Sequence, residues 1–258
     1  MIVRHAHRRG LHLNRRTVML ITVSIVVVLC AIIAIRFGLI AAAEAKAKTS
    51  LTNTSAAVKA MTDKLNTSLA DTSQAVSSKV AAVGAYSTKL QDYSKDVCGD
   101  ERTLIYYGFI AYHDNCEQAH LALFALNAAS NNLYGFLSDE ETLAALLPKN
   151  SSNLSYSQQY DLWTRTTGLL RAAKTGDQAQ TLKDTLASAA NNYAAAWNAV
   201  IQADTKKDEA AFNKAEELVK TTYTALQATS AISNKTLQDL TSVFNTKYTA
   251  YTALKLTK

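Results

Sequence analysis

TVMLITVSIVVVLCAIIAI, residues Thr17 to Ile35, is the stretch that decides how the rest of the chain must be arranged. It has no charged residue and nothing more polar than threonine, serine and cysteine. A helix rises about 1.5 Å per residue, so this stretch spans roughly 28 Å, close to the roughly 30 Å hydrocarbon layer of a bilayer. It therefore predicts one membrane-spanning helix, with the long polar remainder on one side of the membrane.

The residues around this stretch predict its orientation. Residues 1–16 contain five arginines and three histidines without any acid, and positive flanks stay on the cytoplasmic side. Beyond Arg36, whose long side chain can reach the outer headgroups, the apolar character continues more weakly to Ala43. We therefore expect a cytoplasmic tail over 1–16, a transmembrane signal-anchor over 17–43 and an extracytoplasmic region from Glu44, in a single-pass protein of the cell membrane.

Cleavage of the N-terminal segment is the alternative to a permanent anchor. Ala41, Ala42 and Ala43 resemble the small residues of a signal-peptidase site, and cleavage there would release a soluble secreted protein. Signal-peptide cores are usually about 7–15 residues long, and the longer apolar run here favours an uncleaved anchor. Arg15 and Arg16 also resemble a twin-arginine export signal, although arginine pairs commonly precede membrane anchors.

The distribution of charge argues against a nucleic-acid partner. The formal net charge is +6, but five of the 27 basic residues lie in the tail and Arg36 is a sixth. Residues 44–258 then carry 21 basic and 21 acidic side chains. The positive excess belongs to the topology signal rather than to a binding face, so we expect no binding of nucleic acid.

The composition of the outer region predicts an all-α fold. Proline occurs once, at Pro148, glycine occurs eight times in the chain, and good helix formers are frequent. Alternation of apolar and polar residues with period two is nearly absent. We expect a transmembrane helix, a long helix and then an up-down antiparallel helical bundle over 98–258, because short connections favour antiparallel neighbours.

Residues 44–97 are predicted to form one long amphipathic helix or stalk. Five apolar residues recur at seven-residue intervals, namely Leu69, Val76, Val83, Leu90 and Val97. This row permits a coiled coil that joins two copies in a homodimer through residues 58–97. It equally fits the first helix of an intramolecular bundle, which the abundance of later amphipathic helices favours. Those helices are expected over 116–137, from Ser138, over 156–174 and 177–203, from Asp208 and from near Ser233, with a loop over 148–155.

Cys98 and Cys116 are predicted to form a disulfide bond. They are the only cysteines outside the apolar run, and an extracytoplasmic compartment is oxidising. Bridged Cα atoms lie about 5.5–6 Å apart, whereas one continuous helix would hold these two about 27 Å apart. The chain must therefore turn back between them, and a straight first helix would display the enclosed loop far from the membrane.

This enclosed segment contains the expected contact site. TLIYYGFIAYH, residues 103–113, is the most aromatic stretch outside the apolar run. Tyrosine is favoured at interfaces because it joins an apolar ring to a polar tip. We predict that Tyr106, Tyr107, Phe109 and Tyr112 bind a protein partner at the cell surface, with packing inside the apex of the bundle as the alternative.

A metal site is the main chemical alternative. His113, Glu117 and His120 lie close together, and the Glu-x-x-His spacing occurs in dimetal helical bundles. Only one such pair exists, and a straight helix separates the two histidines by about 10.5 Å along its axis, too far for one ion. The two histidines and both outer cysteines have the ligand types of a zinc site, but this set competes with the disulfide. We therefore expect no metal and no other cofactor.

The sequence shows no recognisable catalytic set. Its serines lie outside any G-x-S-x-G elbow, and its outer glycines are isolated, so a phosphate-binding loop is missing. We expect a non-enzymatic, membrane-anchored protein with an interaction or scaffolding role at the cell surface. A sensor-like ectodomain is the alternative, and its sixteen-residue tail would then require a membrane partner to carry the signal inward.

Overall fold

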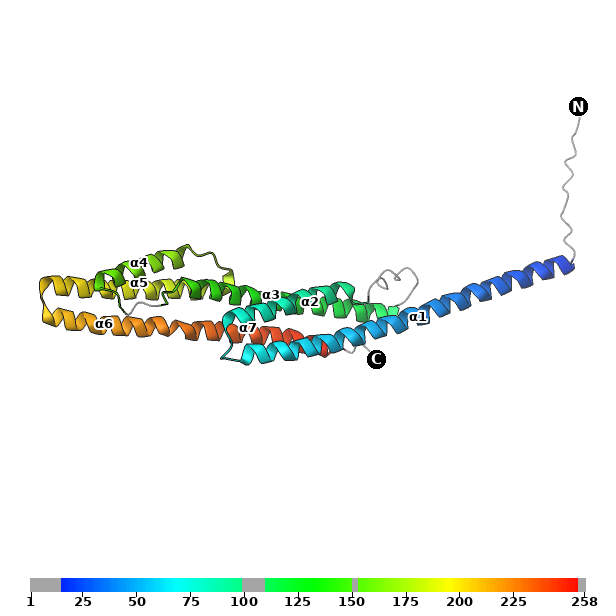
Figure 1. Ribbon diagram of the computed structural model, residues 1–258. Helices are drawn as coiled ribbons and strands as arrows, with labels where there is room; N and C mark the ends of the chain where they lie inside the picture. Colours follow the sequence, from blue (N-terminus) through cyan, green and yellow to red (C-terminus); the bar gives the residue numbers. More distant parts are fainter. Residues whose placement is uncertain (1–14, 99–109, 150–152, 255–258) are drawn as a thin grey trace, which may run out of the picture.

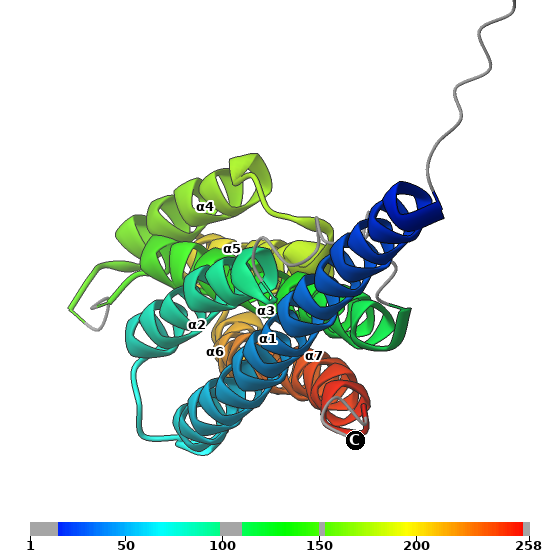
Figure 2. The ribbon, with the colours of Figure 1, turned by 90° about the vertical axis from the view of Figure 1, so that its right-hand side faces the viewer.

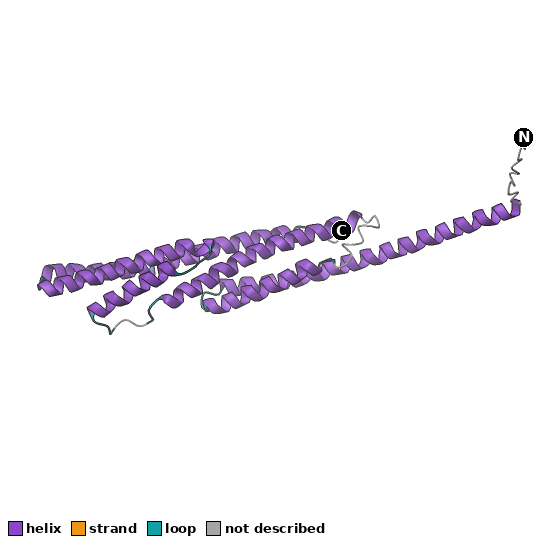
Figure 3. Cartoon of the chain, turned by 90° about the horizontal axis from the view of Figure 1, so that it is seen from above, coloured by secondary structure: helices purple, strands orange, loops and turns teal. Residues whose placement is uncertain are grey.

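The fold is an elongated antiparallel helical bundle at the end of one long N-terminal helix (Figure 1, Figure 3). The computed structural model describes residues 15–98, 110–149 and 153–254, and every regular element within them is a helix. The elements are α1 (Arg15–Ala70), α2 (Val76–Asp96), α3 (Ile110–Leu146), α4 (Tyr156–Ala172), α5 (Asp177–Lys206), α6 (Glu209–Gln227) and α7 (Thr229–Thr252). The predicted all-α helical bundle with an apolar N-terminal helix is therefore confirmed.

Helix α1 starts as an exposed apolar helix and ends inside the bundle. Side chains such as Val26 and Ile33 are more than half exposed, whereas Leu51, Val58 and Leu65 are buried. Within the described part of the chain, this is the one helix long and apolar enough to cross a membrane, judged by length and composition. The apolar segment therefore continues into the bundle core along one helix.

The chain turns back at residues 71–75, so the single helix predicted over 44–97 is wrong. Asp71 Oδ1 accepts hydrogen bonds from the backbone N and Oγ of Ser73, at 2.9 and 2.6 Å, and this local turn replaces a further helical turn. The buried Lys79 Nζ donates to the carbonyl oxygen of Leu69 at 3.2 Å. It thereby satisfies one of the free carbonyls at the end of α1 and holds α2 alongside it.

The buried stripe of α1 follows an eleven-residue repeat rather than the predicted seven. Its buried residues are Ala47, Leu51, Thr54, Val58, Thr62, Leu65 and Leu69. This repeat gives about 3.67 residues per turn, close to that of a straight helix, so little supercoiling is needed to keep the stripe against its neighbours. The seven-residue row crosses the 71–75 turn, and Val83 and Leu90 are buried on α2 within the same chain.

Helix α3 is longer than predicted. It runs through Ser138, where a separate short helix was expected. Its buried positions keep heptad spacing along the shared core, at Cys116, Ala119, Leu123, Leu126, Ser130, Leu133 and Leu137. Asp139 then lies within the helix, and its Oδ2 accepts a hydrogen bond from the backbone N of Gly176, at 2.8 Å, just before α5. This bond connects α3 to the entry of α5.

The bundle has two halves that share α3. In the half next to the apolar segment of α1, the helices α1, α2 and α7 pack around α3 (Figure 2). In the far half, α5 packs between α4 and α6, and α4 and α5 contact the C-terminal part of α3 (Figure 1). Helices α6 and α7 meet end to end at Ala228 and form one rod, the α6–α7 rod. Like α3, this rod connects the two halves.

Buried tyrosines should make the bundle sensitive to alkali. Tyr251 is 1% exposed, and burial raises its pKa to about 12, while burial also raises the pKa of Tyr86. A tyrosine in the unfolded chain has a pKa of about 10. Between about pH 10 and pH 12 the unfolded chain therefore loses the Tyr251 proton while the folded chain keeps it, so the free energy of unfolding falls as the pH rises.

We expect Tyr251→Phe to reduce this dependence on pH, because phenylalanine has no proton to lose. The measurement is urea unfolding of both proteins at several pH values from 9 to 12, followed by near-UV circular dichroism. Equal slopes of unfolding free energy against pH in the two proteins would contradict the prediction.

Candidate functional site

A disulfide bond joins Cys98 to Cys116, as predicted, with Cα atoms 5.9 Å apart. Cys98 follows α2 in the left-handed conformation, with φ of 63°. Its backbone N donates a hydrogen bond to Ser50 Oγ on α1 at 3.1 Å. The disulfide therefore lies where α1, the end of α2 and the start of α3 meet.

This disulfide lies at the end of the bundle nearest the apolar segment of α1, so the expectation that it is displayed far from that segment is wrong. That expectation assumed a straight helix as far as Val97. The turn at 71–75 sends α2 back along α1, and its end returns to Ser50. Ser50 follows Ala43, the end of the predicted anchor, by seven residues, or about 10 Å along a helix.

The aromatic residues predicted to bind a partner fall largely outside the described residues. These are Tyr106, Tyr107 and Phe109. Tyr112 belongs to the first turn of α3, but its side chain is also outside the described part. The prediction of a contact site therefore stays a prediction, although the disulfide places both ends of the 98–116 segment beside α1.

The residues considered for a metal site, His113, Glu117 and His120, do not form one in the described part of the chain, and His120 instead makes a contact between helices. His120 Nδ1 lies 2.6 Å from the carbonyl oxygen of Ser94, so the ring connects α3 to α2. Both cysteines are oxidised in the disulfide, so the zinc site that used their thiolates is wrong. Glu117 is exposed on α3, and the side chain of His113 lies outside the described part. Among the side chains that are described, no three potential metal ligands come together.

An aromatic cavity in the far half was missed by the sequence interpretation. Its volume is about 760 Å³, and α3, α4, α5, α6 and the start of α7 line it. Four of its lining residues are Trp163, Tyr193, Trp197 and Tyr223. The Tyr193 ring meets Trp163 edge-on at 4.9 Å between centroids and lies 5.6 Å from Tyr223. Burial raises the pKa of Tyr193, so its phenol remains neutral well above neutral pH.

Polar groups of complementary kinds lie among these rings. Trp163 is 4% exposed, and its Nε1 is buried without a hydrogen-bond acceptor. Glu140 on α3 accepts a hydrogen bond from Ser233 Oγ on α7 and is half-buried. Lys149 and Tyr223 are exposed and also line the cavity, so it opens to solvent. The accessible lining therefore combines apolar ring surface with a carboxylate, while the Trp163 N–H is buried away from the open space.

The sequence places Tyr193 and Trp197 on one apolar face of the predicted helix 177–203, where they suggest ordinary core packing. Their neighbours Trp163 and Tyr223 come from α4 and α6, and helical periodicity does not define which residues of separate helices meet. One signal was available: the chain has only two tryptophans. Tryptophans favour sites where a ring is buried and its N–H needs a partner.

A larger groove, of about 1260 Å³, runs between α1 and α7. Asn66 Nδ2 donates to Asn245 Oδ1 across the two helices at 3.1 Å. Thr246 Oγ1 donates to the carbonyl oxygen of Ser242 at 2.9 Å within α7. Asn66 Oδ1 is buried without a hydrogen-bond partner, and the lining of this groove contains no aromatic ring.

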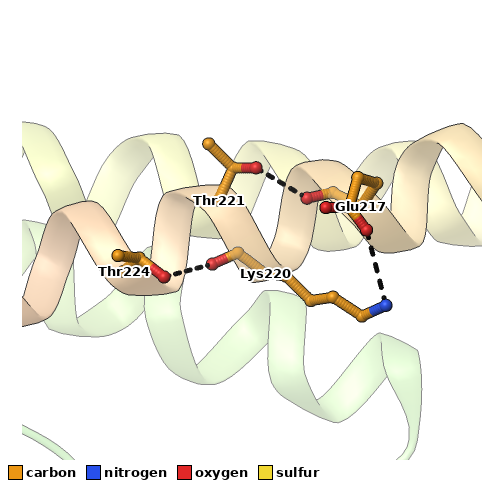
Figure 4. Close-up of polar contacts among 4 residues, drawn as sticks. All are labelled: Glu217, Lys220, Thr221 and Thr224. Atoms are coloured by element: carbon orange, nitrogen blue, oxygen red, sulfur yellow. Dashed lines mark hydrogen bonds and ion pairs between the residues drawn. The ribbon is translucent and has the colours of Figure 1, made fainter.

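The exposed face of α6 is occupied by contacts within its own helix (Figure 4). Thr221 and Thr224 donate their hydroxyls to the carbonyl oxygens of Glu217 and Lys220, at 2.9 and 3.0 Å. Lys220 Nζ also lies 3.4 Å from Glu217 Oε2. These hydroxyls already donate their protons within the helix, so this threonine-rich face is typical of solvated surface.

Two features of the described residues can therefore carry function, the disulfide corner and the aromatic cavity. No protein-family model, curated protein or solved structure matches this chain.

Proposed function

We propose that this chain is a single-pass membrane protein whose helical ectodomain binds a partner at the cell surface without catalysing a reaction. The continuity of α1 carries the proposal. One helix includes both the exposed apolar side chains around Val26 and buried core residues such as Leu51. An unbroken helix would hold the bundle at a defined height and orientation above the bilayer.

The basic tail supports an orientation with the N-terminus in the cytoplasm and the bundle outside. A disulfide bond is consistent with this orientation, since such bonds persist in oxidising compartments. The helix also passes through Ala41–Ala43 and reaches buried Ala47 one turn later. Cleavage there would cut α1 beside the core, which supports an uncleaved signal-anchor.

The proposed contact site remains the aromatic set Tyr106, Tyr107, Phe109 and Tyr112. Its ends are attached beside Ser50, about 10 Å along α1 from Ala43. A partner that binds so close to the bilayer is best explained as another membrane protein, because the anchor of that protein would hold its contact surface at the same height above the bilayer. We therefore propose an integral membrane protein as the partner.

Replacement of Tyr106, Tyr107 and Phe109 by serine should remove this partner. Cross-linking is done on intact cells with an amine-reactive reagent that does not cross membranes. The first lysine of the chain is Lys46, and Lys46 and Lys48 are exposed near Ser50. Reaction at these lysines, distinguished by peptide mapping from reaction at the N-terminal amine, therefore requires the bundle to be outside. We expect the wild-type chain to capture an integral membrane protein and the triple variant to lose most of it.

The matched control is Leu169→Ser, which removes an exposed apolar side chain (53% exposed) from α4 in the far half. It should leave capture unchanged, and near-UV circular dichroism should show both variants folded. Equal capture by the wild-type chain and the triple variant would contradict the proposed contact site, and absence of any cross-linking from outside would contradict the orientation.

A sensor-like ectodomain is the second candidate, and the aromatic cavity favours it. The cavity lies where α3 and the α6–α7 rod pass between the two halves of the bundle, and α7 continues from there along α1. A homodimer through residues 58–97 has less support, because Leu65, Leu69, Val83 and Leu90 are buried within one chain.

A further inference from the structure

We propose that the outward face of α3 binds the same face of a second copy of this chain, so that two bundles stand side by side in the same orientation. This face is a third feature of the molecule, separate from the disulfide corner and the aromatic cavity. Only the parallel orientation of the two copies rests on the proposed membrane anchor. The contact itself follows from the spacing, exposure and charge of α3.

A row of exposed residues runs along α3 with the spacing of a helical seam. Leu121 and Phe124 are 58% and 63% exposed, and Ala128, Asn131 and Gly135 continue the row, also exposed. Steps of three and four residues alternate along it, which is the spacing by which two helices pack side by side over a long contact. The buried residues of α3 keep the same spacing, so the exposed row stays in line over about 21 Å.

The surface around this row carries no charge. Residues 118–138 of α3 and residues 80–88 of α2 contain no aspartate, glutamate, lysine or arginine. A Cβ atom added to Gly84 of α2 would lie 3.0 Å from Tyr134 Cε2 of α3, so the two uncharged stretches are adjacent. The solvated face of a helix normally carries charged and polar side chains. The two exposed apolar side chains therefore lie in a surface that suits contact with protein.

Gly135 gives a separate indication that another helix approaches this face. Glycine is the poorest helix former after proline, yet Gly135 lies in the interior of a 37-residue helix. Apart from the backbone of its own helix, a Cβ atom here would meet no described atom within 4 Å. Packing within the described chain therefore does not explain the glycine. A residue without a side chain allows a second backbone to come close, and Ala128 on the same row is small as well.

A second copy of the chain fits this face without any mismatch. In a parallel pair related by a two-fold axis, each residue of the row faces its own equivalent. Like charges on the row would then repel each other, and the row has none. Asn131 would meet its equivalent, and an amide can pair with its own kind because it has both a donor and an acceptor.

The proposed anchor favours this pairing over other arrangements. It holds every copy with the same end of the bundle toward the bilayer and at the same height, as a parallel pair in register requires. Two copies in one bilayer also have a high effective concentration for each other, so a short seam is sufficient.

Disulfide trapping in the purified full chain tests the pairing. All variants carry Cys30→Ser, which removes the free cysteine and leaves the Cys98–Cys116 bond intact. Ala128→Cys places a thiol on the row, and Val243→Cys places one at an exposed position of α7 (49% exposed) in the same half of the bundle. After mild oxidation in detergent, we expect Ala128→Cys to form a covalent dimer and Val243→Cys to form at least fivefold less.

Gly135→Cys distinguishes a parallel pair from an antiparallel one. In a parallel pair it should also form a covalent dimer, because position 135 faces itself. In an antiparallel pair centred on Ala128, the two thiols would lie about 21 Å apart along the helices, too far for a disulfide.

Phe124→Lys in the Ala128→Cys protein should lower the yield of covalent dimer at least fivefold, because it places two like charges on the seam. Val243→Lys is the matched control and should leave the yield unchanged. Both side chains are exposed, so near-UV circular dichroism should show both variants folded.

Four outcomes would overturn the inference: no covalent dimer at position 128, equal trapping at positions 128 and 243, trapping at 128 without trapping at 135, or a dimer that persists after Phe124→Lys. The purified protein contains no other chain, so these outcomes do not affect the capture of a membrane partner on cells. Loss of that capture would likewise leave the trapping result unchanged.

Discussion

Replacement of Phe244 by alanine will lower the free energy of unfolding by about 3–5 kcal/mol, the cost typical of removing a buried aromatic side chain. Phe244 is fully buried on α7, and its ring meets Tyr86 of α2 edge-on at 5.4 Å between centroids. Tyr86 OH and Thr62 Oγ1 of α1 are hydrogen-bonded at 2.8 Å. The cavity left by Phe244 would therefore open beside the contacts that join α1, α2 and α7.

Val243 provides the matched control, because it is adjacent on α7 but 49% exposed. Val243→Ala should change the free energy of unfolding by no more than about 0.5 kcal/mol, as is usual for surface positions. The measurement is urea unfolding of the full chain in detergent, followed by near-UV circular dichroism. Similar losses in the two variants would show that Phe244 is not a core residue.

Removal of the disulfide should have the second largest effect. Cys98 and Cys116 are separated by 18 residues, and closing a loop of about this length stabilises a fold by about 3 kcal/mol. For an ectodomain of about 215 residues, this corresponds to a decrease of about 6–12 °C in the midpoint of thermal unfolding. The double variant Cys98→Ser/Cys116→Ser is preferred, because a single replacement leaves a reactive thiol.

The wild-type protein treated with reductant is the control for this variant. It should unfold at the same temperature as the double variant, and reductant should not change the double variant further. Ser50→Ala tests the second attachment of this corner, since it removes the acceptor of the Cys98 backbone N–H. A reduced wild-type protein that is as stable as the oxidised one would contradict the assigned role of the disulfide.

Local chemistry in the sequence predicted much of this fold. The single proline and the scarcity of glycine indicate helices. The helix expected from Asp208 was correctly placed, since Asp208 Oδ1 accepts a hydrogen bond from Ala211 N at 3.0 Å and caps α6. The disulfide followed from the compartment and the number of cysteines. These inferences succeeded because each depends on residues near one another or on a count.

The prediction failed where two local patterns competed. The seven-residue row from Leu69 to Val97 remains in phase across residues 71–75, although these residues form a turn in which Asp71 binds Ser73. Periodicity alone could not show the turn, because both helices bury the row within one chain. The missed turn led the sequence to place the disulfide corner at the far end of the bundle, whereas the structure places it beside Ser50, near the apolar segment of α1.

The aromatic cavity could not have been predicted from periodicity. Trp163, Tyr193 and Tyr223 lie on three helices, and their meeting depends on the axial register of those helices. Register is determined by the loops and by contacts such as Asp139 with Gly176 N, which join residues 37 positions apart. Apolar residues on one face of a helix indicate burial but do not identify their neighbours.

The continuity of α1 also determines a rotational phase. Each residue turns an α-helix by about 100° and advances it by about 1.5 Å. The side of α1 that buries Ala47 and Leu51 in the bundle therefore dictates which side of residues 17–43 faces any given direction in the bilayer. A neighbouring helix that contacts one side of residues 17–43 would therefore always face the same side of the bundle. Insertion of one residue in α1 between the anchor and the bundle would rotate the bundle away from that helix.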